Sequence, residues 1–119
     1  MAKIRTSIIR DTLELCDRNG EVEKAIPITI NAARVANDVT RLRVEMANAK
    51  NDAEATGRAA VELFTVLFGG DATREIMDYY GDDYFTMISD LTPYIVEDIY
   101  PVFDKMREKS IEMRKKIKK

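Results

Sequence analysis

Residues 9–30, which read IRDTLELCDRNGEVEKAIPITI, decide the start of the fold. Asn19-Gly20 is typical of a two-residue type I′ turn, because both central residues of that turn need a positive φ. This turn places Arg18 opposite Glu21 in a β-hairpin over residues 9–30. The resulting register gathers six apolar side chains onto one face: Ile9, Leu13, Leu15, Ile26, Ile28 and Ile30. Since an isolated two-stranded ribbon is marginally stable, we expect this face to cover helices or a partner.

The rest of the chain is predicted to be helical. The expected helices span about 32–50, 53–68, 71–80 and 83–118, and their expected N-caps are Asn31, Asp52, Asp71 and either Asp82 or Asp83. One apolar stripe runs through the first two segments without a change of register, so two shapes are open. They are a single rod across 32–68, or two antiparallel helices separated near Lys50-Asn51-Asp52. We favour the separation, because Asn51-Asp52 and Gly57 weaken a helix locally.

The last predicted helix, 83–118, is long and contains two prolines. Thr92 is suited to an N-cap with Pro93 at the first helical position, so the helix can restart there. Pro101 removes one backbone hydrogen bond and predicts a bend. The predicted fold class is therefore mainly α. We expect a single domain of residues 1–119, in which an N-terminal hairpin precedes a bundle of about four helices, the last one long and proline-bent.

The composition excludes several classes of catalytic and metal site. The chain has 119 residues, no histidine, one cysteine (Cys16) and five glycines. Without histidine there is no Ser-His-Asp or Cys-His arrangement and no His-bearing zinc motif, and one cysteine cannot build a four-cysteine zinc site. None of the glycines stands in a phosphate-binding motif. We therefore expect no enzyme, no catalytic residue, no metal and no cofactor.

Cellular location is constrained by what the sequence lacks. No apolar stretch approaches the roughly 20 residues that span a bilayer, so no membrane association is expected. Met1-Ala2-Lys3-Ile4-Arg5 begins no secretory signal. The lone Cys16 cannot form an internal disulfide, which suits a reducing compartment.

Charge is arranged in blocks along the chain. Residues 1–70 are balanced, residues 71–104 carry a net charge of −8, and the helix end at 105–119 carries +6. The first interpretation of the basic block is a solvated helix end. The second is head-to-tail self-association between opposite charges of two copies, namely Asp78, Asp82 and Asp83 against Lys109, Arg114, Lys115 and Lys116. Nucleic-acid binding ranks last, because the chain is acidic overall and no aromatic residue lies among those bases.

All nine aromatic residues lie between residues 64 and 103. Most of them fit a core in which the last helices pack together. The region 84–103, however, carries apolar groups around much of the helix circumference, and such a helix is either buried or contacts another chain. Full burial is hard to arrange in so small a protein. We therefore expect oligomerisation or a hydrophobic partner.

Several short segments form a pattern along nearly the whole chain. They are LCDRNG at 15–20, IPITIN at 26–31, ELFTVLFG at 62–69, DAT at 71–73, IMDYY at 76–80, DY at 83–84, LTPYI at 91–95 and a lysine-rich end. In this order they resemble the small tail assembly chaperones of long-tailed phages and prophages that infect Gram-positive bacteria.

This resemblance implies a non-enzymatic role in the cytoplasm of a bacterial host. Such chaperones are thought to coat the long, apolar, helical tape measure protein before tail tube subunits polymerise around it, and to be absent from the finished virion. They are helical and self-associate in rings or spirals, and the tail tube protein is a further possible partner. The expected contact surface, shared between core, self-contact and client, is Leu63, Phe64, Leu67, Phe68, Tyr84, Ile88, Tyr94, Ile95 and Ile99.

Two alternative functions remain open at this point. One is a structural or scaffolding phage protein that stays in the particle. The other is a small nucleic-acid-binding regulator that uses the basic end of the chain at 105–119.

Overall fold

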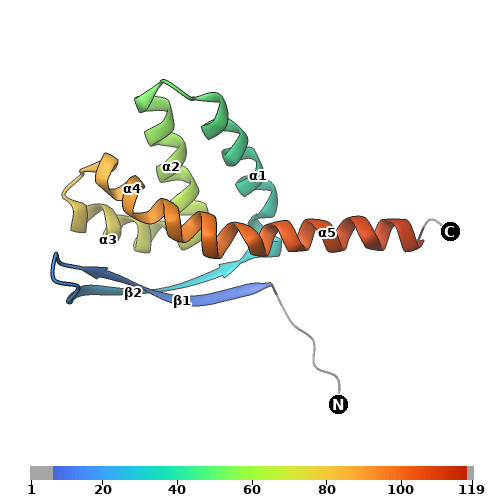
Figure 1. Ribbon diagram of the computed structural model, residues 1–119, viewed down its shortest axis with the longest axis horizontal. Helices are drawn as coiled ribbons and strands as arrows, with labels where there is room; N and C mark the ends of the chain where they lie inside the picture. The colour runs from blue at the N-terminus through green and yellow to red at the C-terminus, as the bar shows by residue number, and fades with distance from the viewer. Residues whose placement is uncertain (1–6, 118–119) are drawn as a thin grey trace, which may run out of the picture.

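The computed structural model describes residues 7–117. Its elements are β1 (Ile8–Cys16), β2 (Val22–Asn31), α1 (Ala32–Asn48), α2 (Ala53–Phe68), α3 (Gly70–Tyr80), α4 (Tyr84–Tyr94), the π-helical segment η1 (Ile95–Ile99) and α5 (Tyr100–Ile117). The hairpin lies along one side, and α3 and the α4–α5 run pack above it (Figure 1). The α1–α2 pair rises from the hairpin, so that the loop between these two helices lies far from the sheet. The predicted fold class is confirmed. The ends of the predicted 1–119 domain, 1–6 and 118–119, lie outside the described residues.

The hairpin pairs in the predicted register over most of its length. Leu13 lies opposite Ile26, and Ile9 lies opposite Ile30. Five of the six residues of the predicted apolar face are buried, and Ile9 is half-buried: the five are Leu13, Leu15, Ile26, Ile28 and Ile30. The face covers helices, which is how a two-stranded ribbon becomes stable here.

The predicted type I′ turn is wrong. Within the turn only Gly20 has a positive φ, 83°. The N–H of Gly20 donates to the Asp17 carbonyl at 3.0 Å, and the N–H of Asp17 donates to the Glu21 carbonyl at 2.9 Å. The loop therefore holds three residues, and Arg18 does not face Glu21. A bulge beside Leu15 absorbs the additional residue, so the register beyond it is unchanged.

The α1–α2 pair is antiparallel, so the single rod is wrong and the separated helices are right. α1 ends at Asn48, two residues before the predicted end, and α2 begins at Ala53. The Asp52 carboxylate accepts the N–H of Ala55 at 3.0 Å as an N-cap. Asn31 caps α1 in the same way, as predicted, by accepting the N–H of Arg34 at 3.3 Å.

The N-cap of α3 differs from the prediction. For α4, the structure decides between the two predicted N-caps, Asp82 and Asp83. Gly69, with φ 90°, occupies the cap position of α3, so Asp71 is not the N-cap but lies in the first turn. Gly81 ends α3 in the left-handed region, with φ 59°. Asp82 follows with φ 65°, and Asp83 caps α4 by accepting the N–H of Thr86 at 3.2 Å. Two successive left-handed residues turn the chain sharply there.

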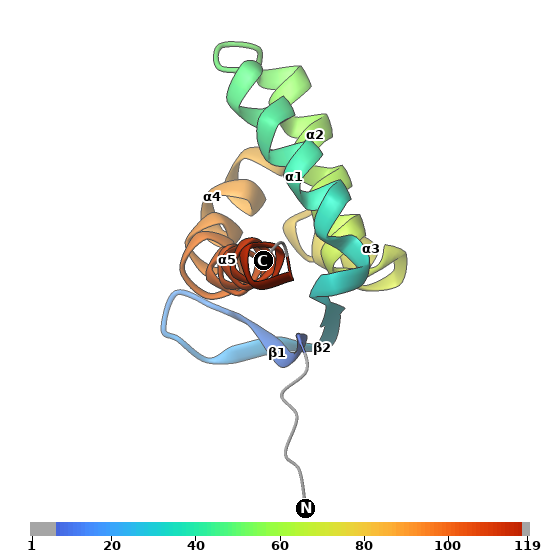
Figure 2. The same ribbon diagram turned by 90° about the vertical axis from the view of Figure 1, so that its right-hand side faces the viewer.

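α4, η1 and α5 form one helical run of 34 residues that changes direction near η1 (Figures 1 and 2). The predicted restart at Pro93 is wrong. Pro93 lies inside α4, and the Thr92 hydroxyl donates to the Ile88 carbonyl instead of capping a new helix. The N–H of Tyr100 donates to the Ile95 carbonyl, five residues back, just before Pro101. This π turn accommodates the missing donor of Pro101.

A single apolar core joins the hairpin to every helix. α2 lies at its centre, because it packs against α1, α3, α4 and β2. The largest side chains that are fully enclosed include Phe64, Leu42, Ile76 and Met87, each from a different helix. This arrangement leaves the first turns of α2 and the end of α5 outside the core.

Candidate functional site

The nine apolar residues expected to contact partners do not form one surface. Six of them are buried in the core: Leu63, Phe64, Leu67, Phe68, Ile95 and Ile99. These six therefore belong to the core, which is one of the three roles expected for the set, and they are not accessible in the folded single chain. Their burial is possible despite the short chain because the apolar face of the hairpin adds a third layer beneath α3 and α4 (Figure 2).

The other three, Tyr84, Ile88 and Tyr94, are partly accessible, and they have different roles. Tyr94 is half-buried, and its hydroxyl donates to the Asp11 carboxylate at 2.9 Å, which ties α4 to β1. Tyr84 is 42% exposed and Ile88 is half-buried, and both line a groove on the surface. Only Tyr84 and Ile88 of the predicted contact residues therefore belong to a candidate binding site.

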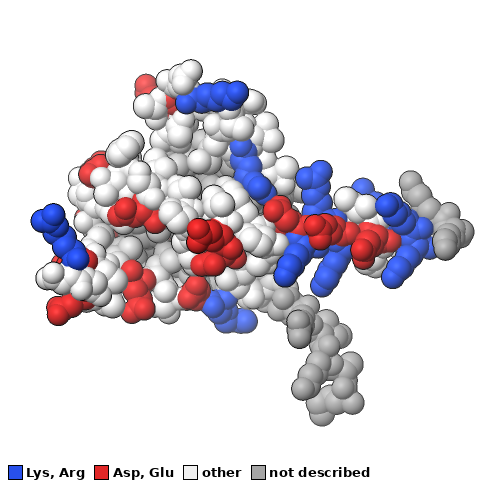
Figure 3. Space-filling view, in the orientation of Figure 1, with Lys and Arg blue, Asp and Glu red and all other residues white. Residues whose placement is uncertain are grey.

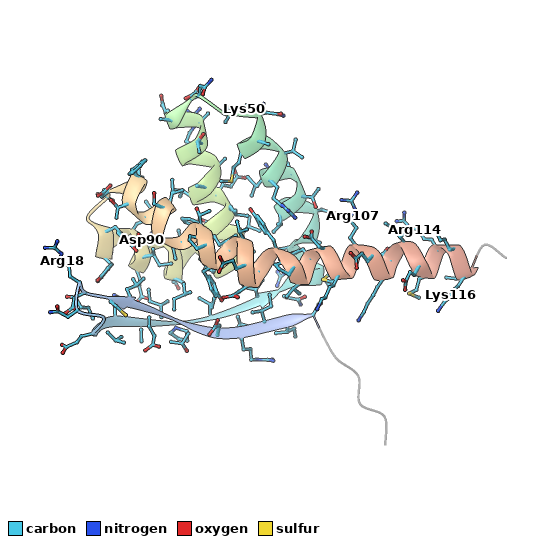
Figure 4. All side chains as sticks on the ribbon, viewed as in Figure 1. Arg18, Lys50, Asp90, Arg107, Arg114 and Lys116 are labelled. Carbon is cyan, nitrogen blue, oxygen red and sulfur yellow. The ribbon has the colours of Figure 1, made fainter. Side chains whose placement is uncertain are left out.

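This groove lies between the first turns of α2 and the first turns of α4, and it has a volume of about 850 Å³. We call it the α2–α4 groove. Its apolar lining is Ala53, Val61, Met77, Tyr84, Phe85 and Ile88, and its charged rim on the α1–α2 side is Lys50, Glu54, Arg58 and Glu62. Lys50 at the α1–α2 tip and Asp90 on α4 mark the elements on its two sides in Figure 4. An open apolar groove is suited to receive a helix or another extended apolar segment.

Phe85 is the most exposed large apolar residue of the described chain, at 82%. We did not single it out from the sequence, although a signal was present. Met87 and Leu91 are the buried residues of α4, and Phe85 lies on the opposite side of the helix from Met87. An aromatic residue opposite the buried stripe of a short helix therefore indicated a contact site.

Gly57 keeps the groove open on the α2 side. It lines the groove, and a Cβ built at this position would meet no other atom within 4 Å. Helix α2 thus carries its smallest residue where the groove needs space. The glycine lowers helix propensity by about 1 kcal/mol relative to alanine, and nothing in the local packing requires it.

The charged residues predicted for self-association lie at opposite ends of the molecule. Asp78, Asp82 and Asp83 are exposed at the end of α3 and the α3–α4 turn, and Lys109, Arg114, Lys115 and Lys116 are exposed near the end of α5. The longest axis of the molecule measures 55 Å, and α5 extends along it away from the α3–α4 turn (Figure 1). None of these seven residues forms an ion pair with another residue between 7 and 117. The structure does not bring the two groups together within one copy.

Asp83 has a structural role that the charge pattern did not reveal. Its carboxylate accepts hydrogen bonds from the hydroxyl and the N–H of Thr86, at 2.7 and 3.2 Å. These bonds hold the pKa of Asp83 below its ordinary value. Both carboxylate oxygens of Asp83 therefore take part in the N-cap of α4.

α5 leaves the body of the protein after its first two turns. Arg43 of α1 pairs with Asp104 at 3.1 Å, and its guanidinium lies 4.0 Å from the centre of the Tyr100 ring. Beyond Met106 every described residue is exposed, including Ile111, Met113 and Ile117. We call residues 107–117 the distal part of α5; Arg107, Arg114 and Lys116 mark it in Figure 4.

Within residues 7–117 there is neither a cluster of metal-binding side chains nor a helix that could span a membrane. No group of three or more histidine, cysteine, aspartate or glutamate side chains among them could hold a metal ion. In the same part of the chain, no helix is long and apolar enough to cross a bilayer.

Comparisons of this chain with protein-family models, with curated proteins and with solved structures found no match.

Proposed function

We propose that this chain is a tail assembly chaperone of a long-tailed phage or prophage. It acts in the bacterial cytoplasm without catalysis, self-associates, binds the apolar helical tape measure protein and leaves before the virion is complete. The observation that carries the proposal is the α2–α4 groove with the exposed ring of Phe85 beside it. The order of sequence segments supports the same role.

The groove has dimensions that suit a helix of the tape measure protein. Its α2 side runs from Ala53 to Glu62, which is about 15 Å of helix and matches about three turns of a client helix. Tyr84, Phe85 and Ile88 supply one wall, and Val61 with Met77 supplies the floor. Aromatic anchors in a desolvated groove dominate the energy of such contacts.

Co-expression tests this proposal directly. A tape measure fragment that precipitates alone should stay soluble with the wild-type chain. It should precipitate again with Phe85→Ser or Gly57→Leu, because one variant removes an anchor and the other fills the groove. Val44→Ser is the matched control, since Val44 is an exposed apolar residue of α1 outside the groove lining.

The proposal fails if the fragment is equally insoluble with and without the wild-type chain. Detection of the chain in purified virions would instead favour a structural protein that stays in the particle.

Nucleic-acid binding is not part of the proposal. Acidic side chains are interleaved with the basic ones along the projecting α5 (Figure 3), and no aromatic residue lies among residues 107–117. Stacking on bases would need such residues.

A further inference from the structure

A second groove lies between α1 and α5. It is lined by residues of α1 between 36 and 44 and by residues of α5 between 103 and 114, and it has a volume of about 660 Å³. We call it the α1–α5 groove. It shares no lining residue with the α2–α4 groove, because α5 runs out past α1 whereas α4 lies beside α2 (Figure 1). The two grooves can therefore be occupied independently.

Apolar side chains line the α1–α5 groove from both helices. Val39 and Phe103 line it from the core, where both are buried. Val44 on the α1 side is 55% exposed, and Ile111 on the α5 side is 44% exposed. Two large apolar side chains that line one groove from opposite helices form a surface that apolar side chains of a partner can cover.

The charged residues of this groove are mainly basic. Arg43 pairs with Asp104, the only acid of the groove lining, at 3.1 Å, so these two charges compensate each other. Arg107 and Arg114 also line the groove, and neither forms an ion pair with another residue between 7 and 117. Figure 4 shows both side chains pointing from α5 to the side on which α1 stands. The groove thus presents two guanidinium groups whose charge its lining does not neutralise.

The nearby acids of α1 and α5 lie outside the groove. Glu108 and Glu112 lie at least about 100° around the α5 axis from the two arginines, and neither lines the groove. On α1, Asp38 and Glu45 both pair with Arg41, at 3.8 and 3.0 Å, and they do not line the groove either. An acidic partner therefore meets an uncompensated basic surface with apolar walls.

The dimensions of the groove suit a helix whose acids have a defined spacing. Its α5 side, from Phe103 to Arg114, is about 18 Å of helix and matches about three turns of a partner helix. Arg107 and Arg114 are separated by about 10.5 Å along α5. A helix that lies alongside α5 brings carboxylates to both guanidinium groups when its acids are also two turns apart, and arginine is suited to pair with carboxylates.

We propose that the α1–α5 groove binds a helix of another protein in which two acidic residues, seven positions apart, flank two apolar residues. The carboxylates pair with Arg107 and Arg114, and the apolar residues between them pack against Val44 and Ile111. This partner is not the apolar client of the α2–α4 groove, and the inference does not rest on the proposed function.

Two other occupants fit the groove less well. Nucleic acid would pair its phosphates with the arginines but would leave the apolar walls uncovered. A second copy of this chain has acids at the right spacing on α3, at Asp71 and Asp78, but the residues between them on that face are Arg74 and Glu75. Neither occupant supplies acids and apolar groups together.

A fluorescently labelled helical peptide of about 18 residues tests the groove with the full chain. The peptide carries two glutamates seven positions apart, with leucines at the third and fourth positions after the first glutamate and alanine and glutamine elsewhere. Fluorescence anisotropy should show that it binds the wild-type chain. A matched peptide with lysines in place of the two glutamates should bind at least about tenfold more weakly.

Reversing the charge of the groove should reverse this preference. Arg107→Glu/Arg114→Glu should bind the glutamate peptide about tenfold more weakly than the wild type does, and the lysine peptide more tightly. Lys109→Glu/Lys116→Glu is the matched control, because it makes the same change of charge at the same spacing on the opposite face of α5. Figure 4 shows Lys116 pointing away from α1, so this control should keep the preference of the wild type.

The apolar part of the contact has its own variant. Ile111→Ser leaves the charge unchanged and should weaken binding of the glutamate peptide about fivefold. Phe85→Ser, in the α2–α4 groove, should leave peptide binding unchanged. Arg107→Glu/Arg114→Glu should still keep the tape measure fragment soluble in co-expression, so failure of this inference is distinguishable from failure of the proposed function.

The inference is overturned if the glutamate peptide does not bind the wild type, or if it binds no better than the lysine peptide. It is also overturned if Lys109→Glu/Lys116→Glu weakens binding as much as Arg107→Glu/Arg114→Glu, since that result shows a general attraction of charges. Circular dichroism of each variant separates loss of binding from loss of folding.

Two further results would assign the groove to another occupant and overturn the inference as well. A single-stranded oligonucleotide that displaces the peptide, and whose binding is lost in Arg107→Glu/Arg114→Glu but kept in Ile111→Ser, would assign the groove to nucleic acid. A mass that rises with concentration in light scattering for the wild type but not for Arg107→Glu/Arg114→Glu would assign it to a second copy.

Discussion

Three tyrosine hydroxyls on α3 and α4 each donate a hydrogen bond to a carboxylate on another element. Tyr79 reaches Glu23 at 2.8 Å, Tyr80 reaches Asp90 at 2.9 Å, and Tyr94 reaches Asp11 at 2.9 Å. The sequence indicated that aromatic residues of this region lie in the core. It could not indicate these pairs, because two of the three carboxylates are in the hairpin, more than 50 residues away.

For a single residue of this set, we predict that Tyr94→Phe lowers the free energy of unfolding by about 1 kcal/mol. The substitution keeps the ring and removes the donor to Asp11. Urea unfolding of the wild type, Tyr94→Phe, Asp11→Ala and the double variant gives the coupling between the two side chains. Independent, additive effects of the two substitutions would contradict the role given to this hydrogen bond.

The raised pKa values of two of these tyrosines, Tyr80 and Tyr94, predict a loss of stability at alkaline pH. Burial, followed by the hydrogen bonds to Asp90 and Asp11, raises the pKa of Tyr80 and Tyr94 above the ordinary value of about 10. A raised pKa in the folded state stabilises the protein fully below the unfolded value, and the contribution is lost as pH rises through the folded value. We expect Tm to fall above about pH 10, and to fall less in Tyr80→Phe/Tyr94→Phe. Equal slopes for both proteins would count against this account.

Helix boundaries were predictable from the sequence where a cap acts locally. Asn31, Asp52 and Asp83 each accept an N–H three residues on, so their effect is encoded within one turn. The position of Pro93 inside a helix was not predictable in this way. Pro93 lies inside α4 and has no N–H to donate to the carbonyl of Ser89, four residues back. Both residues are exposed, so water can reach the Ser89 carbonyl. The hairpin turn also escaped prediction, because the Asp17 carboxylate accepts the N–H of Asn19 and of Glu21 and favours the longer loop.

For helix α2 we predict that Gly57→Leu raises the free energy of unfolding by about 0.5–1 kcal/mol, since leucine is the better helix former. A Cβ at this position meets no other atom within 4 Å, so the start of the added side chain causes no clash that would oppose this gain. Thermal and urea unfolding measure the change. A lower stability would show that Gly57 serves packing and not the opening of the groove.

For the molecule as a whole, the apolar helical stripes were predictable from the sequence, but which of their residues are buried was not. Leu63 and Phe64 looked equivalent to Tyr84 and Ile88 in the sequence, because all four lie on apolar helical stripes. In the folded chain the first pair is buried in the core, whereas the second pair lines a groove. A groove between α2 and α4 depends on how two helices diverge in space, which no local pattern specifies. The distal part of α5 was predictable as basic, but its separation from the acidic end was not.

Amide hydrogen exchange should divide the molecule into two regions. Residues of α2 and α4 in the core should be strongly protected, whereas amides of 107–117 should exchange rapidly in dilute protein, because no side chain there is buried. Strong protection of 107–117 in the monomer would contradict the exposed position of this helix.

The projecting end of α5 would give a head-to-tail assembly of this protein a direction. If the acidic α3–α4 turn of each copy meets the basic end of α5 of the next, a row of copies has an acidic terminus and a basic terminus, and it can grow at either. Such a row contains no feature that counts its members. Its length would then be set from outside, by the number of sites on whatever polymer it accompanies.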